Sequence, residues 1–527
     1  MPRVLMLAIV LFFAFFAPLR ESAFSQSPKA SAGNRLAYLD ELDPYYPHAK
    51  FPKLITPQWV GEDGVEAVVI LAIDDMREPA KYEAFLRPIL RRLQKIDGRA
   101  PVSIMTCKVD PKDPQLQTWL KEGLSLECHT IDHPCPFFKP GFEKAKSTYD
   151  RCVDLMNEIP NNKPVAFRMP CCDSLNTPSP RHWAEIFNKT TEKGNFLQID
   201  SSVFMYYTSD DAELPKNLTL DADGKERFKR YLPMDRSFVN TIENYPYPYV
   251  IGNLCWEFPC MTPSDWEAQH LQKSNNPKTV EDWKAALDCT VLKQGVMTMV
   301  FHPHGWIRND QLVELIDHAV AKHGKKVKFL TFKEALERLN KNHLGGKALR
   351  PAPPSLAEKR IAINQTVDVL GDGNPLNFGW EYRRDVLMSR KIGGKFVPWI
   401  KFDLPDGARL SVANGQGPDF GLRFRDLDGD GKLDIIFSNE KEYGIYLFTD
   451  MEKGWSKKVF HQKRGDPASR AASAAGSADE FPMISRHGAN NGFWVHSGYL
   501  WWSNEDTVLL KDHVDRRKIS DLLRGAK

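Results

Sequence analysis

The chain has 527 residues, of which 42% are hydrophobic and 26% are charged. This apolar content excludes a disordered chain and is enough for two or three globular domains with substantial cores. The formal net charge is only +3, from 71 basic and 68 acidic residues, so the overall charge predicts neither a nucleic acid nor an anionic membrane as partner.

The N-terminus has the features of a secretory signal. Arg3 precedes an apolar run over residues 4–19, and Ala23 and Ser25 bracket a cleavage point. This run of 16 residues is shorter than the roughly 20 that span a bilayer comfortably. We therefore predict a signal peptide over residues 1–25 and a secreted, periplasmic or cell-surface protein without a stable membrane span after cleavage. An uncleaved anchor is the alternative.

Export permits disulfide bonds, and the chain has nine cysteines. None of them forms a CxxC pair, which argues against a zinc knuckle or a haem attachment site. We expect a few disulfides of open connectivity, and the odd count leaves at least one cysteine over. The cysteines are Cys107, Cys128, Cys135, Cys152, Cys171, Cys172, Cys255, Cys260 and Cys289.

Strand and helix patterns alternate in the first half of the chain. Residues 67–73 form a short apolar run typical of a buried parallel strand, and residues 81–96 show helical spacing of apolar side chains. A strand over 102–109, a helix over 115–123 and a strand over 124–129 follow. This order indicates βαβ units and therefore an α/β sheet or barrel.

A glycine- and proline-rich linker at residues 341–356 divides the chain. We predict an N-terminal extension over 26–59 and an α/β domain over 60–340. Residues 202–293 are rich in loop signals and break the alternation, so we interpret them as an insertion over one face. Short alternating segments after the linker predict a smaller, mostly β domain over 357–527.

Polar residues follow several predicted strands, where functional side chains of α/β proteins gather. Asp74 and Asp75 come directly after the first strand. Two like charges forced together at a partly buried strand end raise the pKa of one of them unless a cation or a metal neutralises the pair. Arg168 follows a short apolar segment, and His302 and His304 follow the strand predicted over 296–301.

His129 and His133 follow the third strand. Pro134 disfavours helical geometry at His133, so we predict a strand-to-turn placement. Thr130 stands where the helical zinc-protease motif needs a glutamate, which excludes that motif. One aspartate and two imidazoles leave a coordination position open for water, which is typical of catalytic zinc.

These motifs have the order and the flanking residues of the polysaccharide deacetylase family, the NodB-homology carbohydrate esterases. The segment "AIDDM" resembles the first family motif, "HTIDHP" the second, "FRMP" the third and "VFHPH" the fifth. The resemblance covers about residues 60–335. It implies a distorted (β/α) barrel of the polysaccharide deacetylase type, followed here by the smaller, mostly β domain.

The resemblance also implies roles for individual residues. Asp74 would be the catalytic base, and Arg168 would orient it. His302 would be the acid that protonates the leaving amine. The metal ligands would be Asp75, His129 and His133, with Zn²⁺ or another divalent transition metal as the ion.

Some positions depart from the family pattern or leave alternatives open. The fourth motif has no clear match, and Asp200 is our candidate for an acidic partner of Arg168. His304 competes with His302 for the acid role, but the spacing from Val300 favours His302. Cys171 replaces an aromatic residue that lines the sugar groove, although its backbone N–H can still stabilise an oxyanion. Cys128 and Cys135 are either bystanders or part of a disulfide.

The expected function is that of an exported metal-dependent hydrolase that removes acetyl groups from an N- or O-acetylated polysaccharide. Its partner would be the acetylated glycan, and the oligomeric state is open. A glycan-binding or adhesion protein that keeps the fold without turnover is one alternative. Another is a metal-dependent amidohydrolase acting on a small molecule. The missing aromatic at Cys171 favours these alternatives, whereas the complete set of aspartates and histidines favours catalysis.

The second half contains one further motif, "DLDGDGKLD" over residues 426–434. Its alternating carboxylates form an oxygen-only ligand set suited to Ca²⁺. The set closes at the ninth position and a strand follows, so the motif is not an EF-hand. It resembles the calcium loops of FG-GAP and VCBS repeats, with "FGLRF" just upstream. Only one clear copy is present, so a partial propeller, a β-sandwich and a module completed by a partner stay open. The predicted ligands are Asp426, Asp428, Asp430, the carbonyl of Lys432, and Asp434.

Overall fold

The computed structural model describes residues 45, 53–187, 189–232, 241–251 and 255–346 of the N-terminal part. In the C-terminal part it describes residues 366–367, 369–370, 376–380, 386–392, 395–398, 404–409, 419–465, 480–510 and 513–526. The predicted signal peptide, most of the N-terminal extension and residues 347–356 of the linker lie outside the described residues. Within the part of the chain that is described, no helix has the length and apolar character needed to cross a membrane.

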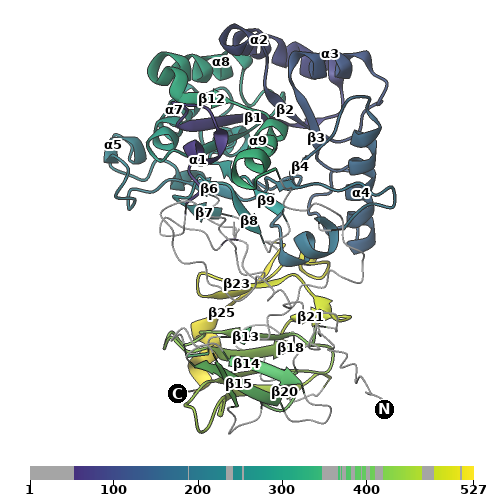
Figure 1. The fold of residues 1–527 in the computed structure, drawn as a ribbon, viewed down its shortest axis with the longest axis vertical. Helices are drawn as coiled ribbons and strands as arrows, with labels where there is room; N and C mark the ends of the chain where they lie inside the picture. The colour runs from purple at the N-terminus through teal and green to yellow at the C-terminus, as the bar shows by residue number, and fades with distance from the viewer. Residues whose placement is uncertain are drawn as a thin grey trace, which may run out of the picture.

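The N-terminal part is an α/β barrel built around one mixed, mainly parallel sheet (Figure 1). The central strand β1 (Ala67–Met76) lies between β11 (Val296–Phe301) and β2 (Val102–Thr106), and all three run parallel. Alternate residues of β1 enter two different hydrophobic clusters. The strand is therefore buried on both faces, which explains its continuous apolar sequence. The sheet continues through β3 (Ser125–Cys128), β4 (Ala166–Phe167) and β5 (Ile199–Asp200), and β12 (Val327–Phe329) also pairs with β1.

Two interrupted strands close the barrel. β5 is followed by β6 (Phe204–Tyr206), and β9 (Cys255–Glu257) is followed by β10 (Cys260–Met261). β5 pairs with β9, β6 pairs with β10, and β10 pairs with β11. The ring that starts at β11 and passes through β1 to β5 therefore returns to β11. The predicted fold class, an α/β barrel followed by a smaller β-rich part, is confirmed.

Helices cover the outside of this barrel (Figure 1). Several begin with a proline in the first turn, where the missing N–H is not needed. The helices predicted over 81–96 and 115–123 are found as α2 and α3. The described α-helices of this part are α1 (Thr56–Val60), α2 (Pro79–Asp97), α3 (Pro114–Glu122), α4 (Phe142–Glu158), α5 (Lys216–Thr219), α6 (Asp265–Gln272), α7 (Pro277–Leu292), α8 (Asn309–His318) and α9 (Phe332–Arg338). The described π-helices are η1 (His182–Phe187), η3 (Ala319–His323) and η5 (Leu339–His343), and the 3₁₀-helices are η2 (Lys229–Tyr231) and η4 (Gly324–Lys326).

The sequence predicted that residues 202–293 are an insertion over one face. The structure instead places part of this segment in the barrel wall. β6, β9 and β10 from this segment are part of the barrel wall, and β7 (Thr241–Glu243) and β8 (Tyr249–Ile251) extend the same sheet. These strands have only two or three residues each. Strands this short do not give a detectable alternation of apolar and polar residues.

The C-terminal part contains antiparallel sheets. One consists of β13 (Thr366–Val367), β14 (Leu376–Trp380), β15 (Val386–Ile392) and β16 (Lys395–Pro398), and another of β17 (Leu422–Arg425), β18 (Asp434–Ser438), β19 (Glu442–Leu447) and β20 (Lys457–Lys463). β21 (Ser485–Arg486) pairs with β22 (Ala489–Asn490), and β23 (Phe493–His496), β24 (Tyr499–Trp502) and β25 (Asp515–Lys518) form a three-stranded sheet. The chain ends in α11 (Ile519–Leu522) and η8 (Leu523–Ala526), after η7 (Thr507–Leu509).

Two hairpins in this part share one construction. The β17–β18 hairpin begins after Gly421 and ends at Ser438, and the β23–β24 hairpin begins after Gly492 and ends just before Ser503. In each hairpin the serine N–H donates to the glycine carbonyl, and both glycines have positive φ. A Cβ on either glycine would lie within 2.2 Å of the serine carbonyl oxygen. The β23–β24 hairpin is thus a second copy of this unit, with a short turn in place of the acidic loop.

The β23–β24 hairpin packs directly on the barrel (Figure 1). Trp494 and Trp501 of this hairpin belong to the same hydrophobic cluster as the barrel core. Tyr45 packs on Trp494, and the Ser503 hydroxyl donates to the Thr177 carbonyl. The C-terminal part is therefore joined to the barrel by a common apolar core.

Candidate active site

The aspartate pair lies at a bulge in β1. The pairing of β1 with β2 shifts between Ile73 and Met76, and Asp75 has a φ of 70°. Successive residues of a regular strand point to opposite faces, whereas a bulge breaks that alternation. The side chains of Asp74 and Asp75 can therefore both face the same end of the barrel. Asp74 is buried, and its backbone carbonyl accepts a hydrogen bond from the Tyr82 hydroxyl.

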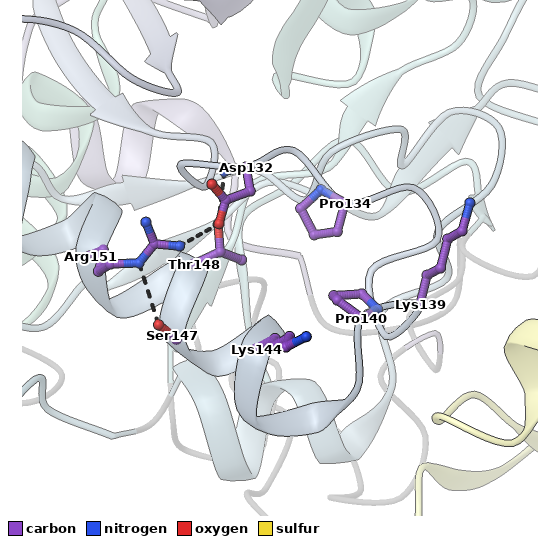
Figure 2. Close-up of a pocket in the computed structure, with 8 residues that line it drawn as sticks. All are labelled: Asp132, Pro134, Lys139, Pro140, Lys144, Ser147, Thr148 and Arg151. Carbon is purple, nitrogen blue, oxygen red and sulfur yellow. Dashed lines mark hydrogen bonds and ion pairs between the residues drawn. The ribbon is translucent and has the colours of Figure 1, made fainter.

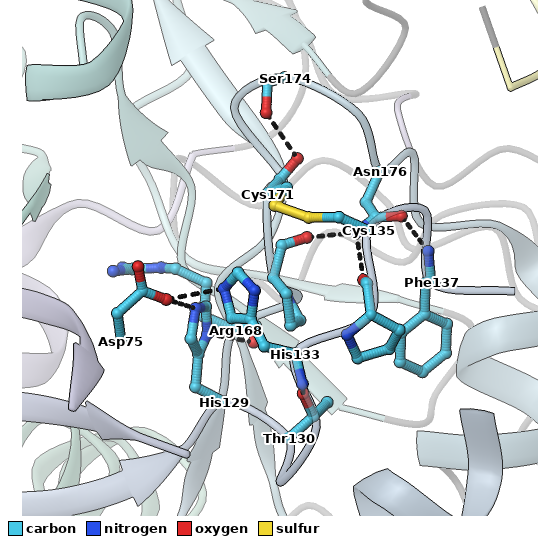
Figure 3. The surroundings of a disulfide bond; sticks show 12 residues. Asp75, His129, Thr130, His133, Cys135, Phe137, Arg168, Cys171, Ser174 and Asn176 are labelled. Atoms are coloured by element: carbon cyan, nitrogen blue, oxygen red, sulfur yellow. Dashed lines mark hydrogen bonds and ion pairs between the residues drawn. A yellow bond between two sulfur atoms is a disulfide. The ribbon is translucent and has the colours of Figure 1, made fainter. Parts of the chain in front are cut away.

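Asp75 lies against the two predicted histidine ligands (Figure 3). Its Oδ1 is 2.7 Å from Nε2 of His133 and 3.3 Å from Nε2 of His129. The three ligand atoms lie within 4.8 Å of one another. No helix passes through residues 129–133, so the predicted strand-to-turn placement is confirmed. The side chain and carbonyl of Thr148 in α4 hold this turn through the N–H groups of Asp132 and Ile131.

This donor set fits a divalent transition metal. His129 Nδ1 donates to the Arg168 carbonyl at 2.8 Å, which leaves the Nε2 lone pair free for an ion. Burial lowers the pKa of His133, which favours the neutral imidazole that metal binding requires. Burial alone would raise the pKa of Asp75, but its close contacts with the imidazoles of His129, His133 and His304 hold it well below its usual range.

Arg168 is fully buried and holds the other aspartate. Its Nη1 donates to Asp74 Oδ1 at 2.7 Å. Its remaining described hydrogen bonds go to Ser201, from Nε to the carbonyl at 2.9 Å and from Nη2 to the hydroxyl at 3.1 Å. This geometry leaves the second carboxylate oxygen of Asp74 without a bond to Arg168.

The expected pairing of Asp200 with Arg168 is wrong. Asp200 instead accepts hydrogen bonds from Trp183 Nε1 at 3.0 Å and from the Ser202 hydroxyl at 2.8 Å. Asp200 and Ser201 are successive residues at the end of β5, so their side chains point to opposite faces. The residue that faces Arg168 is Ser201, and Asp200 is a buried structural carboxylate whose pKa is raised to about 6 by burial.

His302 is paired with a residue that the sequence reasoning missed. Asp265, the first residue of α6, accepts from the His302 backbone N–H and from its Nδ1, each at 2.8 Å. Burial lowers the pKa of His302, but the Asp265 carboxylate outweighs it and raises the value to about 10. Asp265 stands within residues 202–293, the segment predicted to be an insertion, and the pattern of that segment carries no signal of this contact.

His304 contacts the predicted metal ligand Asp75, whereas His302 contacts Asp265. Its Nε2 is 3.0 Å from Asp75 Oδ2, the oxygen that does not face His133. Its Nδ1 is 3.2 Å from Lys81 Nζ. His304 is exposed, whereas His302 is buried and held by Asp265. Of the two histidines, His302 is therefore the one that is buried against a carboxylate partner, as we expect of an acid.

A disulfide connects the two loops that carry these groups (Figure 3). Cys135 and Cys171 are bonded, with a Cα–Cα distance of 6.3 Å. Cys135 comes two residues after His133, and Cys171 follows the Arg168 segment. The other seven cysteines, Cys128 among them, form no disulfide and are buried. The expectation of a few disulfides is therefore corrected to one.

Asn176 joins the same two loops by hydrogen bonds (Figure 3). Its Nδ2 donates to the Pro134 carbonyl at 3.2 Å and to the Pro170 carbonyl. Its Oδ1 accepts from the Phe137 backbone N–H. Together, the disulfide and Asn176 fix the loop of His133 against the loop of Cys171. We call this pair of connections the loop clamp.

A pocket of about 580 Å³ lies beside the histidine loop (Figure 2). Asp132 and Pro134, the two neighbours of His133, form part of its wall. Among the described residues, none of the predicted metal ligands lines it. Arg151 forms an ion pair with Asp132. The lysines of the wall therefore leave the pocket with an excess of positive charge. The other lining residues are Lys139, Pro140, Lys144, Ser147 and Thr148.

The acidic loop of the C-terminal part connects β17 to β18. It brings carboxylate oxygens of Asp426, Asp428 and Asp434 within 4.8 Å of one another. Asp430 instead accepts from the Lys432 ammonium at 2.6 Å. Both oxygens of Asp434 accept backbone N–H groups, from Leu427 at 2.9 Å and Phe448 at 2.8 Å. Three of the predicted calcium ligands are thus gathered, and Asp430 lies outside that group.

The fold and site together define an α/β barrel that carries an Asp-His-His cluster, a buried Asp-Arg pair and a buried His-Asp pair at the carboxyl ends of its strands. Residues 61–179 match the family model described as polysaccharide deacetylase. The resemblance inferred from the motifs is confirmed for this stretch.

Several solved structures are similar to the chain. The peptidoglycan deacetylase PdaC from Bacillus subtilis is 15% identical, covers 54% of this chain and 97% of its own, and has a TM-score of 0.29. The PuuE allantoinase is 12% identical, with 55% and 94% covered and a TM-score of 0.35. The peptidoglycan N-acetylglucosamine deacetylase catalytic domain from Eubacterium rectale is 13% identical, with 52% and 91% covered and a TM-score of 0.28. No curated protein matches the chain.

Proposed function

We propose that the protein is an exported, metal-dependent deacetylase that acts on an N- or O-acetylated glycan. The observation that carries this proposal is the convergence of three groups at one end of the barrel. Asp75, His129 and His133 form a donor set for a divalent ion, and Asp74 and His302 flank it as buried groups with separate partners. This is the arrangement that hydrolysis of an acyl bond requires.

The ion, zinc or a similar transition metal, would activate a water molecule and polarise the acyl carbonyl when bound. Asp74 then acts as the general base. Arg168 holds its Oδ1, so the free Oδ2 accepts the proton of the attacking water. His302 acts as the general acid from Nε2, because Asp265 occupies its Nδ1. Its raised pKa keeps it protonated at neutral pH, and it protonates the leaving amine or alcohol.

The backbone N–H of Cys171 is our proposed donor to the developing oxyanion. A positioned donor of this kind lowers the activation barrier by on the order of 3 kcal/mol. Cys171 has a φ of 52°, and the loop clamp holds this segment against the histidine loop. The indole of Trp306 lies 4.9 Å from the ring of His302. It offers a half-buried aromatic surface near the acid, which the Cys171 side chain does not supply.

The pocket beside the histidine loop is a proposed subsite for an anionic group of the glycan. Lys139 and Lys144 line it (Figure 2), and neither has a described anionic partner. Pro134 and Pro140 add apolar wall. A Lys144→Glu variant should raise KM for a carboxylate-bearing acetylated glycan more than for a neutral one. Equal effects on both glycans would remove the subsite from the proposal.

The test of the function is acetate release from acetylated glycan oligomers by zinc-loaded protein. Asp74→Asn should lower the rate by at least about 100-fold, as loss of a general base does, while the bound zinc is retained. Asp75→Asn is the matched control at the next residue, and it should lose one zinc ion and the activity together. Acetate release that survives Asp74→Asn would overturn the assignment of the base.

The same measurement separates the alternatives. Zinc bound without acetate release from any glycan would support a glycan-binding protein that keeps the fold. Hydrolysis of small amides without action on glycans would support an amidohydrolase. Wild-type protein that binds no transition metal would overturn the site itself.

A further inference from the structure

A second cluster of metal-ligating side chains lies away from the barrel mouth, on the helices α7 and α8. His318 Nε2 is 2.9 Å from Asp288 Oδ1, and His323 Nε2 is 2.7 Å from the same oxygen. Lys322 Nζ holds the other oxygen, Oδ2, at 2.7 Å. Asp288 belongs to α7, whereas both histidines come from the end of α8 and the π-helix η3 that continues it. The cluster therefore joins two neighbouring helices.

The π-helix is what brings the two histidines together. In an α-helix, residues five apart are separated by about 140° around the axis. In a π-helix the backbone hydrogen bonds run from residue i to i+5, so residues five apart lie nearly above one another. η3 covers residues 319–323, and the rings of His318 and His323 are 5.9 Å apart. Short π-helical turns inside α-helices are frequent at functional sites.

The donor set has the chemistry of a zinc site. Two imidazole nitrogens and one carboxylate oxygen are ligands that zinc and its neighbours in the transition series prefer. The three ligand atoms lie within 4.8 Å of one another. The side chains of His318 and His323 are 20% and 11% exposed, so an ion can reach them from solvent. None of these residues contributes to the proposed hydrolysis.

We propose that Asp288, His318 and His323 form a second binding site for a divalent transition metal ion, with one coordination position open to water. The ion would connect α7 to the end of α8 and so stabilise two helices that pack on the barrel. Lys322 would hold the carboxylate oxygen that the ion does not use. Its positive charge also opposes a cation, so Lys322 sets the affinity of the site.

The experiment is zinc titration of the full-length, untagged, metal-free protein by calorimetry, with the bound metal counted by elemental analysis. His323→Gln should bind one ion fewer than the wild type and should keep its rate of acetate release. Lys322→Gln should bind the ion of this site several-fold more tightly. Asp75→Asn removes the other predicted ion and leaves this one.

The count depends only on the difference between His323→Gln and wild type, so it does not require the barrel-mouth site to bind metal. A lower count in His323→Gln with unchanged circular dichroism supports the proposal. An unchanged count, or an affinity that does not respond to Lys322→Gln, overturns it and leaves the cluster as an ion pair between helices.

Discussion

Asp265 accepts both the backbone N–H and the imidazole N–H of His302, each at 2.8 Å. Its position is fixed by the start of α6, where Ser264 is the N-cap and exchanges hydrogen bonds with Glu267. A helix N-terminus also favours a negative charge at this point. Asp265 is thus a rigid positioning residue for the proposed acid.

Replacement of Asp265 by asparagine should lower kcat by at least about 100-fold, because a misoriented or wrongly protonated imidazole cannot deliver its proton. KM and bound zinc should stay unchanged. Steady-state kinetics and metal analysis measure these quantities. The control is Glu267→Gln on the same helix, which keeps the cap and should keep kcat. A parallel rise in KM for Asp265→Asn would point to a structural role instead.

The loop clamp makes the metal site sensitive to thiol chemistry. Cleavage of the disulfide between Cys135 and Cys171 by a phosphine reductant should lower the free energy of unfolding by about 2–4 kcal/mol. It should also weaken zinc binding by at least about tenfold, because His133 is no longer held in place. Competition with a chromogenic chelator measures the affinity. A Cys135→Ser/Cys171→Ser variant is the control, since the reductant should have no further effect on it.

The other half of the clamp is tested by Asn176→Ala. This change leaves the carbonyls of Pro134 and Pro170 and the N–H of Phe137 without their described partner, at a total cost of about 2–4 kcal/mol. Chemical denaturation measures the loss. Asn157→Ala on α4 is the matched control, because Asn157 donates a single hydrogen bond within its own helix. Equal losses for the two variants would contradict the role of Asn176.

Stability near neutral pH should increase on Asp173→Asn. Burial raises the pKa of Asp173 from 3.8 to about 6, so between these values the folded state binds the extra proton and stability falls as pH rises. The difference of about two pH units corresponds to ~3 kcal/mol at pH 7. Asparagine removes this penalty and still accepts the hydrogen bond from Ser264. Unfolding free energies at pH 4 and 7 should show a gain only at pH 7.

Calcium should raise the melting temperature of the protein through the acidic loop. Asp426, Asp428 and Asp434 are gathered there, and the described ion pair of the Lys432 ammonium is with Asp430 rather than with these three. Calorimetry at saturating zinc, with and without calcium, measures the shift. Asp428→Asn should abolish the shift, whereas Lys432→Gln should leave or enlarge it. A shift that persists in Asp428→Asn would mean that calcium binds elsewhere.

The sequence was sufficient for the parts of the site that lie on long, regular strands. β1 and β11 are continuous apolar runs, so the positions of Asp74, Asp75 and His302 at their ends could be predicted. The second family motif likewise located His129 and His133. Arg168 follows a strand of only two residues, and the resemblance rather than the strand pattern identified it.

Contacts between distant segments could not be predicted. Asp265 and His302 are separated by 37 residues, and nothing in the pattern of that region shows that α6 begins beside β11. The choice between Asp200 and Ser201 depends on the register of a two-residue strand. The partner of Cys135 depends on how two loops approach each other. The second hairpin of the C-terminal part was missed because it lacks the acidic loop.

The docking of the β23–β24 hairpin has a consequence for how the protein can be divided. Trp494 and Trp501 complete the apolar core of the barrel half, and the Arg181–Glu505 ion pair spans the same junction. A fragment that stops at the linker would expose a wide aromatic-lined surface to water. Such a fragment should aggregate, and the full-length protein should unfold in one transition that includes both halves.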